Sequence, residues 1–206
     1  MIIAEHPDTG LQIHELAHQG ADLLPACLEV FAEQFPEYAA EPVNIDELRT
    51  AAEAPWDPTA LFQPHLWLIT VQGHPAGMAF FLYNRRRSIG LLLFIAIRVD
   101  YRKAAPSGVS RLSDWVLEYM LHQIRLDGET AGLPALGLAA EVDYPHLMAR
   151  YEQMGMQAID AAYAEPLAGM TASMVGVEAL EQINFHPLLL GVFPLSTAGE
   201  LTTSQM

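Results

Sequence analysis

Residues 89–115 read IGLLLFIAIRVDYRKAAPSGVSRLSDW, and this stretch contains a strand, a loop and the start of a helix in succession. The run 89–99 is almost continuously apolar, which is typical of a strand buried on both faces of a sheet. Small residues follow it, and an amphipathic helix with one apolar stripe is predicted after them. A strand that leads through a loop into a helix is a building unit of α/β folds.

Apolar spacing predicts further elements on both sides of this stretch. Their order is β-α-α-β-β-β-α-β-α-β-β, which indicates an α/β fold with a mixed sheet. The expected strands are 11–16, 66–72, 76–83, 89–99, 135–141, 157–164 and 169–175, and the expected helices are about 24–35, 45–54, 108–126 and one that Pro145 opens.

Acidic and basic residues are separated along the chain. The 206 residues contain ten Lys and Arg against twenty-five Asp and Glu, for a formal net charge of −15. Eight of the ten bases lie in 85–125, whereas 1–60 contains twelve acids and one base. So acidic a chain is not expected to bind nucleic acid, which requires clustered cations. The basic segment suits an anionic ligand and the acidic remainder a cationic one, with solubility as the alternative explanation.

Composition excludes other classes of protein. A chain with 51% hydrophobic and 17% charged residues is not intrinsically disordered. Its single cysteine, Cys27, permits no disulfide within the chain. The apolar run 91–97 is far shorter than the ~20 residues of a membrane-spanning helix, and the first residues lack the pattern of a signal peptide. We therefore expect a cytoplasmic protein with no membrane partner.

The domain organisation is expected to be simple. Residues 1–175 are predicted to form one domain, and 176–206 a C-terminal extension. That extension contains an apolar patch at 187–195 and a polar tail. The sequence leaves open whether the patch folds back over the core or packs against a second subunit in a homodimer.

Three stretches carry motifs of a known family. The first combines residues 11–13 with 22–25, and the second combines 97–102 with 108–112. The third is Tyr-Glu-Gln-Met-Gly-Met at 151–156. Together they span about residues 11–175 and resemble the GCN5-related N-acetyltransferase (GNAT) superfamily. The resemblance implies a mostly antiparallel, twisted sheet flanked by helices. It also implies an enzyme that moves an acetyl group from acetyl-CoA to a primary amine of a small molecule or peptide.

The resemblance also implies a site for coenzyme A. Backbone N–H groups of a small-residue loop at a helix N-terminus can bind phosphate, and the pantetheine arm can pair with a strand edge. The loop departs from the family pattern, because Ala105 takes the place of Gln or Arg and Arg102 lies three residues earlier. The expected cofactor-binding residues are Ile97, Arg98, Val99, Arg102, Lys103, Ser107, Gly108, Val109, Ser110 and Arg111, with no metal.

Aminolysis of a thioester requires a base, a donor to the oxyanion and an acid for the leaving sulfur. Tyr151 matches the family's acid, and a backbone N–H near Val99 is the expected oxyanion donor. Glu141 is our candidate base, because it lies at the end of a strand where α/β sheets collect ligands. Asp143, His146 and a water relay remain alternatives.

Other interpretations remain open. A degenerate member of the family could bind coenzyme A, or nothing, and act as a binding or assembly module. The run 14–18 matches the His-Glu-x-x-His pattern of zinc proteases, but it falls at the end of a strand and Gly20 follows it. The run 85–87 is expected to be a solvated Arg-rich turn. Glu33, Glu37 and Glu41, four residues apart, could form one acidic helix face beside a cationic acceptor.

Overall fold

The computed structural model describes residues 1–19, 22–166 and 185–195. These residues divide into two compact units. The first comprises the described residues up to Leu138 together with Pro194 and Leu195, and the second is Ala139–Phe193. None of the described helices combines the length and the apolarity that crossing a bilayer requires.

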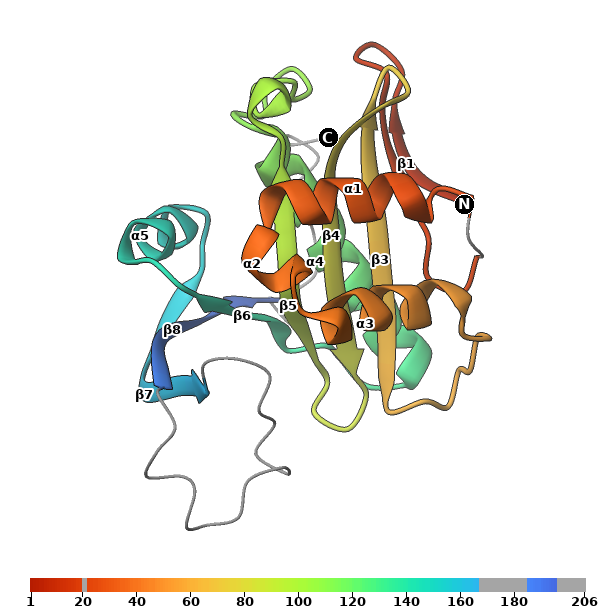
Figure 1. Ribbon diagram of the computed structural model, residues 1–206. Helices are drawn as coiled ribbons and strands as arrows, with labels where there is room; N and C mark the ends of the chain where they lie inside the picture. The colour runs from red at the N-terminus through yellow and green to blue at the C-terminus, as the bar shows by residue number, and fades with distance from the viewer. Residues whose placement is uncertain (20–21, 167–184, 196–206) are drawn as a thin grey trace. The chain divides into compact units, whose positions relative to one another are not determined.

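The first unit is built on five strands in which each strand is antiparallel to the next. Three helices lie in front of this sheet in Figure 1, and a long helix lies behind it. The elements are β1 (Ile2–His6), β2 (Leu11–Glu15), α1 (Leu24–Gln34), α2 (Pro36–Ala39), α3 (Pro42–Glu53), β3 (Phe62–Val71), β4 (His74–Asn84), β5 (Ile89–Ile97), the 3-10 turn η1 (Val99–Tyr101) and α4 (Leu112–Ala131).

Alternation along the strands sorts their side chains between the two faces of the sheet. Even-numbered residues of β3 and β4, such as Leu68 and Phe80, join a buried cluster with α1 and α3. Odd-numbered residues, such as Trp67 and Phe81, belong to the opposite face, where their rings meet edge to face at 4.7 Å. The strands therefore have a core on each side, which explains their nearly continuous apolar sequences.

The second unit contains three strands and one helix. They are β6 (Gly137–Val142), α5 (Pro145–Gln153), β7 (Gln157–Pro166) and β8 (Phe185–Pro194), and β8 lies between the two other strands. Pro145 occupies the first turn of α5, and Gly155 follows its end with a φ of +98°. Both are the positions that these residue types favour.

The predicted fold class, an α/β fold with a mixed and mostly antiparallel sheet flanked by helices, is confirmed. Most of the predicted apolar patch at 187–195 forms strand β8, which pairs with β7. The predicted strand at 169–175 lies outside the described residues.

Several boundaries differ from the sequence-based expectation. The short strand β1 was not predicted; five residues with mixed polarity form it by pairing with β2. The expected Pro-rich loop ends earlier, because residues 62–64 belong to β3. A proline is tolerated at Pro64 because β2 pairs only with the later residues of β3, which leaves that part of the strand at a sheet edge.

Strand β5 is less buried than expected. A β-bulge in the pairing of β4 with β5 places Phe80 opposite Phe94 and Phe81 opposite Leu92, so Leu93 has no partner. Leu93 is 42% exposed, and most other side chains of the strand are half-buried. The prediction of a strand buried on both faces was therefore wrong for β5.

Candidate functional site

The end of β5 presents backbone groups away from β4. The N–H of Arg98 donates to the carbonyl of Ala76 at 2.8 Å, so these residues form a hydrogen-bonded pair of the antiparallel ladder. Directions alternate along a strand, and the backbone groups of Ile97 therefore point to the other edge. Val99 begins the turn η1, where its carbonyl accepts from the N–H of Arg102 at 3.3 Å. Val99 is 67% exposed, and among the described residues its N–H has no partner.

The loop between η1 and α4 contains a glycine, Gly108, with open space beside it. Gly108 has a φ of +91°, and a Cβ built on it would meet no atom within 4 Å. In the described part of the chain, no group accepts from the amides of Gly108, Ser110 and Arg111. These amides lie just before the N-terminus of α4, where the helix dipole favours an anion. The loop thus retains donors that fit a phosphate group.

Other donors of this loop are engaged within the protein. The N–H of Leu112 donates to the carbonyl of Arg102 at 3.1 Å, and that of Val109 to the carbonyl of Pro106. The Arg102 side chain donates from Nε to the carbonyl of Ile97 at 3.3 Å. The predicted helix start at 108 was therefore wrong. Helix α4 begins only at Leu112, after the intervening residues have formed the loop.

The positions of the remaining predicted cofactor residues follow from these contacts. Lys103, Ser107 and Arg111 are exposed, whereas Val109 is half-buried. The Arg98 guanidinium points elsewhere, because it donates to the carbonyl of Pro75 and forms ion pairs with two carboxylates of α1. The Arg98 guanidinium is therefore already engaged within the protein, and only the backbone of Arg98 could contribute to an anion site.

The acidic face predicted on one helix does not form. Helix α1 ends at Gln34 and α2 begins at Pro36, so Glu33, Glu37 and Glu41 do not share a continuous helix. Pro36 cannot donate the hydrogen bond that would continue α1. The Glu33 carboxylate instead lies 2.7 Å from the Arg98 guanidinium, and that of Glu29 lies 2.9 Å from it. Two carboxylates of α1 thus share the single positive charge of Arg98, which follows β5.

The candidate catalytic residues lie in the second unit. Tyr151 is on α5, where its ring packs edge to face with Phe193 at 5.9 Å. Burial raises the pKa of the Tyr151 phenol, and the charge of Arg150 opposes this only in part. The phenol is therefore a donor at neutral pH. Glu141 is exposed near the end of β6, and His146 stacks on Tyr144.

The zinc-protease pattern does not adopt the helix that such a site requires. His14 and Glu15 belong to strand β2, so their side chains lie on opposite faces of the sheet. His14 contacts the Thr70 hydroxyl at 3.1 Å, and His18 contacts the carbonyl of Ala54 at 2.7 Å. The described residues include no group of three or more metal-ligating side chains that could hold an ion.

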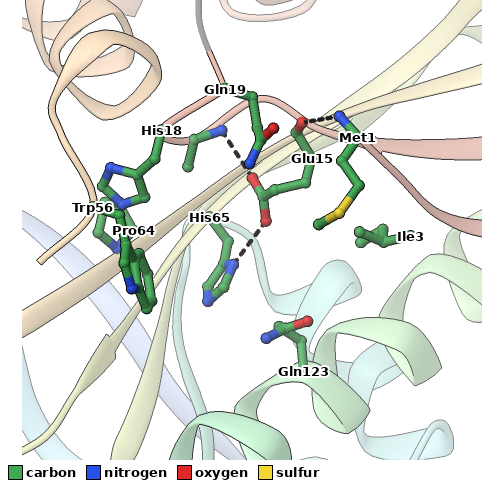
Figure 2. Close-up of a pocket in the computed structure, with 10 residues that line it drawn as sticks. Met1, Ile3, Glu15, His18, Gln19, Trp56, Pro64, His65 and Gln123 are labelled. Carbon is green, nitrogen blue, oxygen red and sulfur yellow. Dashed lines mark hydrogen bonds and ion pairs between the residues drawn. The ribbon is translucent and has the colours of Figure 1, made fainter. Parts of the chain in front are cut away.

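A buried network that the sequence did not predict occupies the face of the sheet toward α4. His65 on β3 contacts Glu15 through Nδ1 at 2.8 Å and Asp127 on α4 through Nε2 at 2.9 Å. Glu15 also accepts from the Trp67 indole at 2.9 Å. Figure 2 shows Glu15 and His65 in the middle of a hollow of about 280 Å³, with Gln123 facing them from α4.

The charge state of this network follows from its geometry. Burial by itself lowers the pKa of the His65 imidazole, but the hydrogen bonds and charges of Asp127 and Glu15 outweigh burial and raise the pKa to about 9. His65 is therefore a cation at neutral pH, held between two carboxylates. Only the isolated polar residues in apolar segments could have signalled such a network, and they do not indicate which residues pair.

Comparison of the whole chain with known proteins gives a consistent result at the level of structure. No family model and no curated protein sequence matches the chain. Solved structures do. An aminoglycoside 6′-acetyltransferase of type Ii has a TM-score of 0.58 at 10% identity, with 91% of this chain and 99% of that one covered.

Two further structures agree. A GNAT-family acetyltransferase from Staphylococcus aureus Mu50 has a TM-score of 0.52 at 10% identity, over 90% of this chain and 99% of that one. A Bacillus subtilis acetyltransferase in complex with CoA has a TM-score of 0.50 at 11% identity, over the same shares. The agreement covers about nine-tenths of the chain at identities that establish only the fold. The protein has the fold of the GNAT acetyltransferases.

Proposed function

We propose that the protein is an acetyl-CoA-dependent N-acetyltransferase that acts on a primary amine of a small molecule or a peptide. One observation carries this proposal. The loop before α4 combines a glycine at positive φ with amides of Gly108, Ser110 and Arg111 that have no hydrogen-bond partner among the described residues. Such a loop at the start of a helix suits the pyrophosphate of coenzyme A.

The residues of the first unit supply the remaining contacts in this proposal. Ser107 and Val109 complete the loop around the phosphates, and Arg102, Lys103 and Arg111 contribute positive charge. The N–H of Val99, which has no partner among the described residues, suits pairing with a carbonyl of a pantetheine arm, and a second bond from the arm to the Ile97 carbonyl would have to share that oxygen with the Arg102 side chain. When bound, acetyl-CoA supplies the activated acetyl group.

Three groups of this chain are proposed to act as the base, as the donor to the oxyanion and as the acid for the leaving sulfur. Glu141 accepts the proton that the attacking amine loses, with Asp143, His146 or a water relay as alternatives. The Val99 N–H donates to the carbonyl oxygen as it gains negative charge. Tyr151 protonates the departing sulfur. Burial raises the pKa of its phenol, which keeps the phenol protonated at neutral pH but makes it a weaker acid, so the transfer takes place only as negative charge develops on the sulfur. The amide bond forms as the thioester bond breaks.

Two observations bear on the acceptor class. The name of one structural neighbour identifies it as an aminoglycoside acetyltransferase, and residues 1–60 of this chain carry a large acidic excess. Both favour a cationic amine, although Glu29 and Glu33 are already paired with Arg98. A cytoplasmic location, a homodimer and a domain ending near 175 complete the proposal.

A second function is favoured by the internal contacts of the loop. The N–H of Leu112 and the side chain of Arg102 both have partners within the protein, and Ala105 offers no polar side chain. A protein with these changes could bind coenzyme A without turning it over and serve as a binding or assembly module. Binding and turnover must therefore be measured separately.

The test is calorimetry with acetyl-CoA and with coenzyme A, followed by assay of free thiol release over a panel of amines. Arg111→Glu places an acid at the start of α4 and is expected to weaken coenzyme A binding about tenfold or more. Arg86→Glu is the matched control, because Arg86 is exposed in the turn between β4 and β5.

Three results are informative. Binding that Arg111→Glu weakens and Arg86→Glu leaves unchanged, together with amine-dependent thiol release, supports the acetyltransferase. Binding without release over the whole panel favours the binding module. Absence of any binding to the wild-type protein contradicts both functions.

A further inference from the structure

A pocket of about 380 Å³ lies within the first unit, beside the C-terminal half of α4. It adjoins the hollow of Figure 2, with which it shares Trp56 and Gln123. At 1.5 Å per residue, Asp127 is roughly 22 Å along α4 from Leu112, so the pocket is remote from the phosphate loop. Its walls are Trp56, Pro58, Gln63, Tyr83, Arg85, Gln123, Leu126, Asp127, Thr130 and Ala131.

One polar side chain of this pocket, that of Tyr83, has no hydrogen-bond partner among the described residues. Tyr83 is 0% exposed, and its hydroxyl has no partner in the described part of the chain. Buried hydroxyl groups are nearly always hydrogen-bonded, because leaving one unpaired is costly. Tyr83 lines the pocket, so a ligand that displaces the atoms covering this hydroxyl would supply the missing partner.

The pocket has two charged side chains, and one of them, the Arg85 cation, has no hydrogen-bond or ion-pair partner among the described residues. Asp127 contacts His65 through one carboxylate oxygen, and its other oxygen accepts from Gln123 at 2.9 Å. The Arg85 guanidinium forms no hydrogen bond or ion pair with a described residue. Its charge contributes to lowering the pKa of Asp57, an exposed carboxylate that already accepts a hydrogen bond from the Thr59 hydroxyl.

The donors and the walls together define a ligand class. The Arg85 guanidinium and the Tyr83 hydroxyl are donors, and a carboxylate accepts from both. The His65 cation lies between Asp127 and Glu15, so it offsets one of their two negative charges, and the Arg85 guanidinium supplies a second positive charge at the pocket. Trp56 and Leu126 are 54% and 39% exposed, so they offer apolar surface to the rest of the ligand.

We propose that this pocket binds a small carboxylate with an apolar body, the carboxylate held by Arg85 and Tyr83 and the apolar body packed on Trp56. The site is separate from the proposed acetyl-transfer site and does not depend on that function. Its volume suits a molecule of about ten heavy atoms, for which an affinity of roughly 0.1 to 1 mM is expected.

The experiment uses three matched probes: phenylacetate, its neutral amide phenylacetamide, and the cation phenethylamine. Binding to the full chain is followed by NMR titration up to about 10 mM, well above the expected dissociation constant. Phenylacetate should bind at least tenfold more tightly than either other probe. Arg85→Gln should weaken it about tenfold, whereas Arg86→Gln, in the same turn, should leave it unchanged.

Tyr83→Phe separates a ligand site from a structural role. The variant removes an unpaired buried hydroxyl, so the free protein should melt at the same temperature or higher, while phenylacetate affinity falls several-fold. The proposal is overturned if phenylacetate does not bind, if the amine binds as well as the carboxylate, or if both Arg85→Gln and Tyr83→Phe bind like the wild type.

Discussion

Tyr151 is the single side chain on which the proposed chemistry depends most. Its phenol is half-buried on α5, and burial raises its pKa, so it can donate a proton but is not a ready base. Tyr151→Phe keeps the ring contact with Phe193 and removes only the hydroxyl. We expect kcat to fall about 10²-fold or more, the usual range for loss of a general acid, with the KM for acetyl-CoA nearly unchanged.

The measurement is steady-state release of thiol as acetyl-CoA is varied, compared with calorimetric binding of coenzyme A to the same variant. Tyr144→Phe is a suitable control, because it removes a hydroxyl from an exposed residue just before the same helix. An unaltered kcat in Tyr151→Phe would remove this residue from the mechanism.

At the scale of a secondary-structure element, helix α4 depends on a glycine inside it. The sequence predicted a helix that ends at about residue 126, yet α4 continues to Ala131, and Gly132, with a φ of +75°, caps it. A Cβ on Gly128 would lie 2.7 Å from the backbone N of Ala135 and from the carbonyl oxygen of Leu133. Gly128 is therefore required for the close approach of the returning chain.

Gly128→Ala tests this packing. Helix propensity alone would favour alanine by about 1 kcal/mol, but the contact with backbone atoms forces a displacement that typically costs about 1–3 kcal/mol. We expect a net loss of stability in urea unfolding. Glu129→Ala, at the exposed neighbouring position, should change stability by no more than about 0.5 kcal/mol. A Gly128→Ala variant as stable as the wild type would contradict the close approach.

At the scale of the whole molecule, the buried network links β2, β3 and α4 and ties folding to pH. The pKa of His65 rises from 6.5 to about 9 in the folded protein, because the bonds to Asp127 and Glu15 outweigh the opposing effect of burial. The protonated form therefore stabilises the fold fully below pH 6.5, and this contribution is lost as the pH rises through 9. Its full size is on the order of 3 kcal/mol.

The check is urea unfolding of the wild type and of His65→Gln at pH values from 6 to 10. The free energy of unfolding should differ most between them at low pH, and the difference should shrink as the pH approaches 9. His146→Gln, on an exposed residue, is the control and should follow the wild type. A difference that stays constant with pH would show that His65 is neutral in the folded protein.

The sequence by itself determined the parts of this protein that depend on local pattern. Apolar spacing located β3, β4 and α1, and Pro145 marked the start of α5, because periodicity and backbone restrictions act over a few residues. The charge-rich loop before α4 was also located, although its exact helix start was not.

Only the tertiary structure decided which distant residues meet. His65 lies 50 residues from Glu15 and 62 from Asp127 along the chain, and Arg98 lies 69 from Glu29. No local spacing encodes such pairs, because they form only when strands and helices pack and must satisfy polar groups away from water. The same packing buried the hydroxyl of Tyr83 and formed the pocket that Tyr83 and Arg85 both line, and no local sequence pattern predicts that pocket.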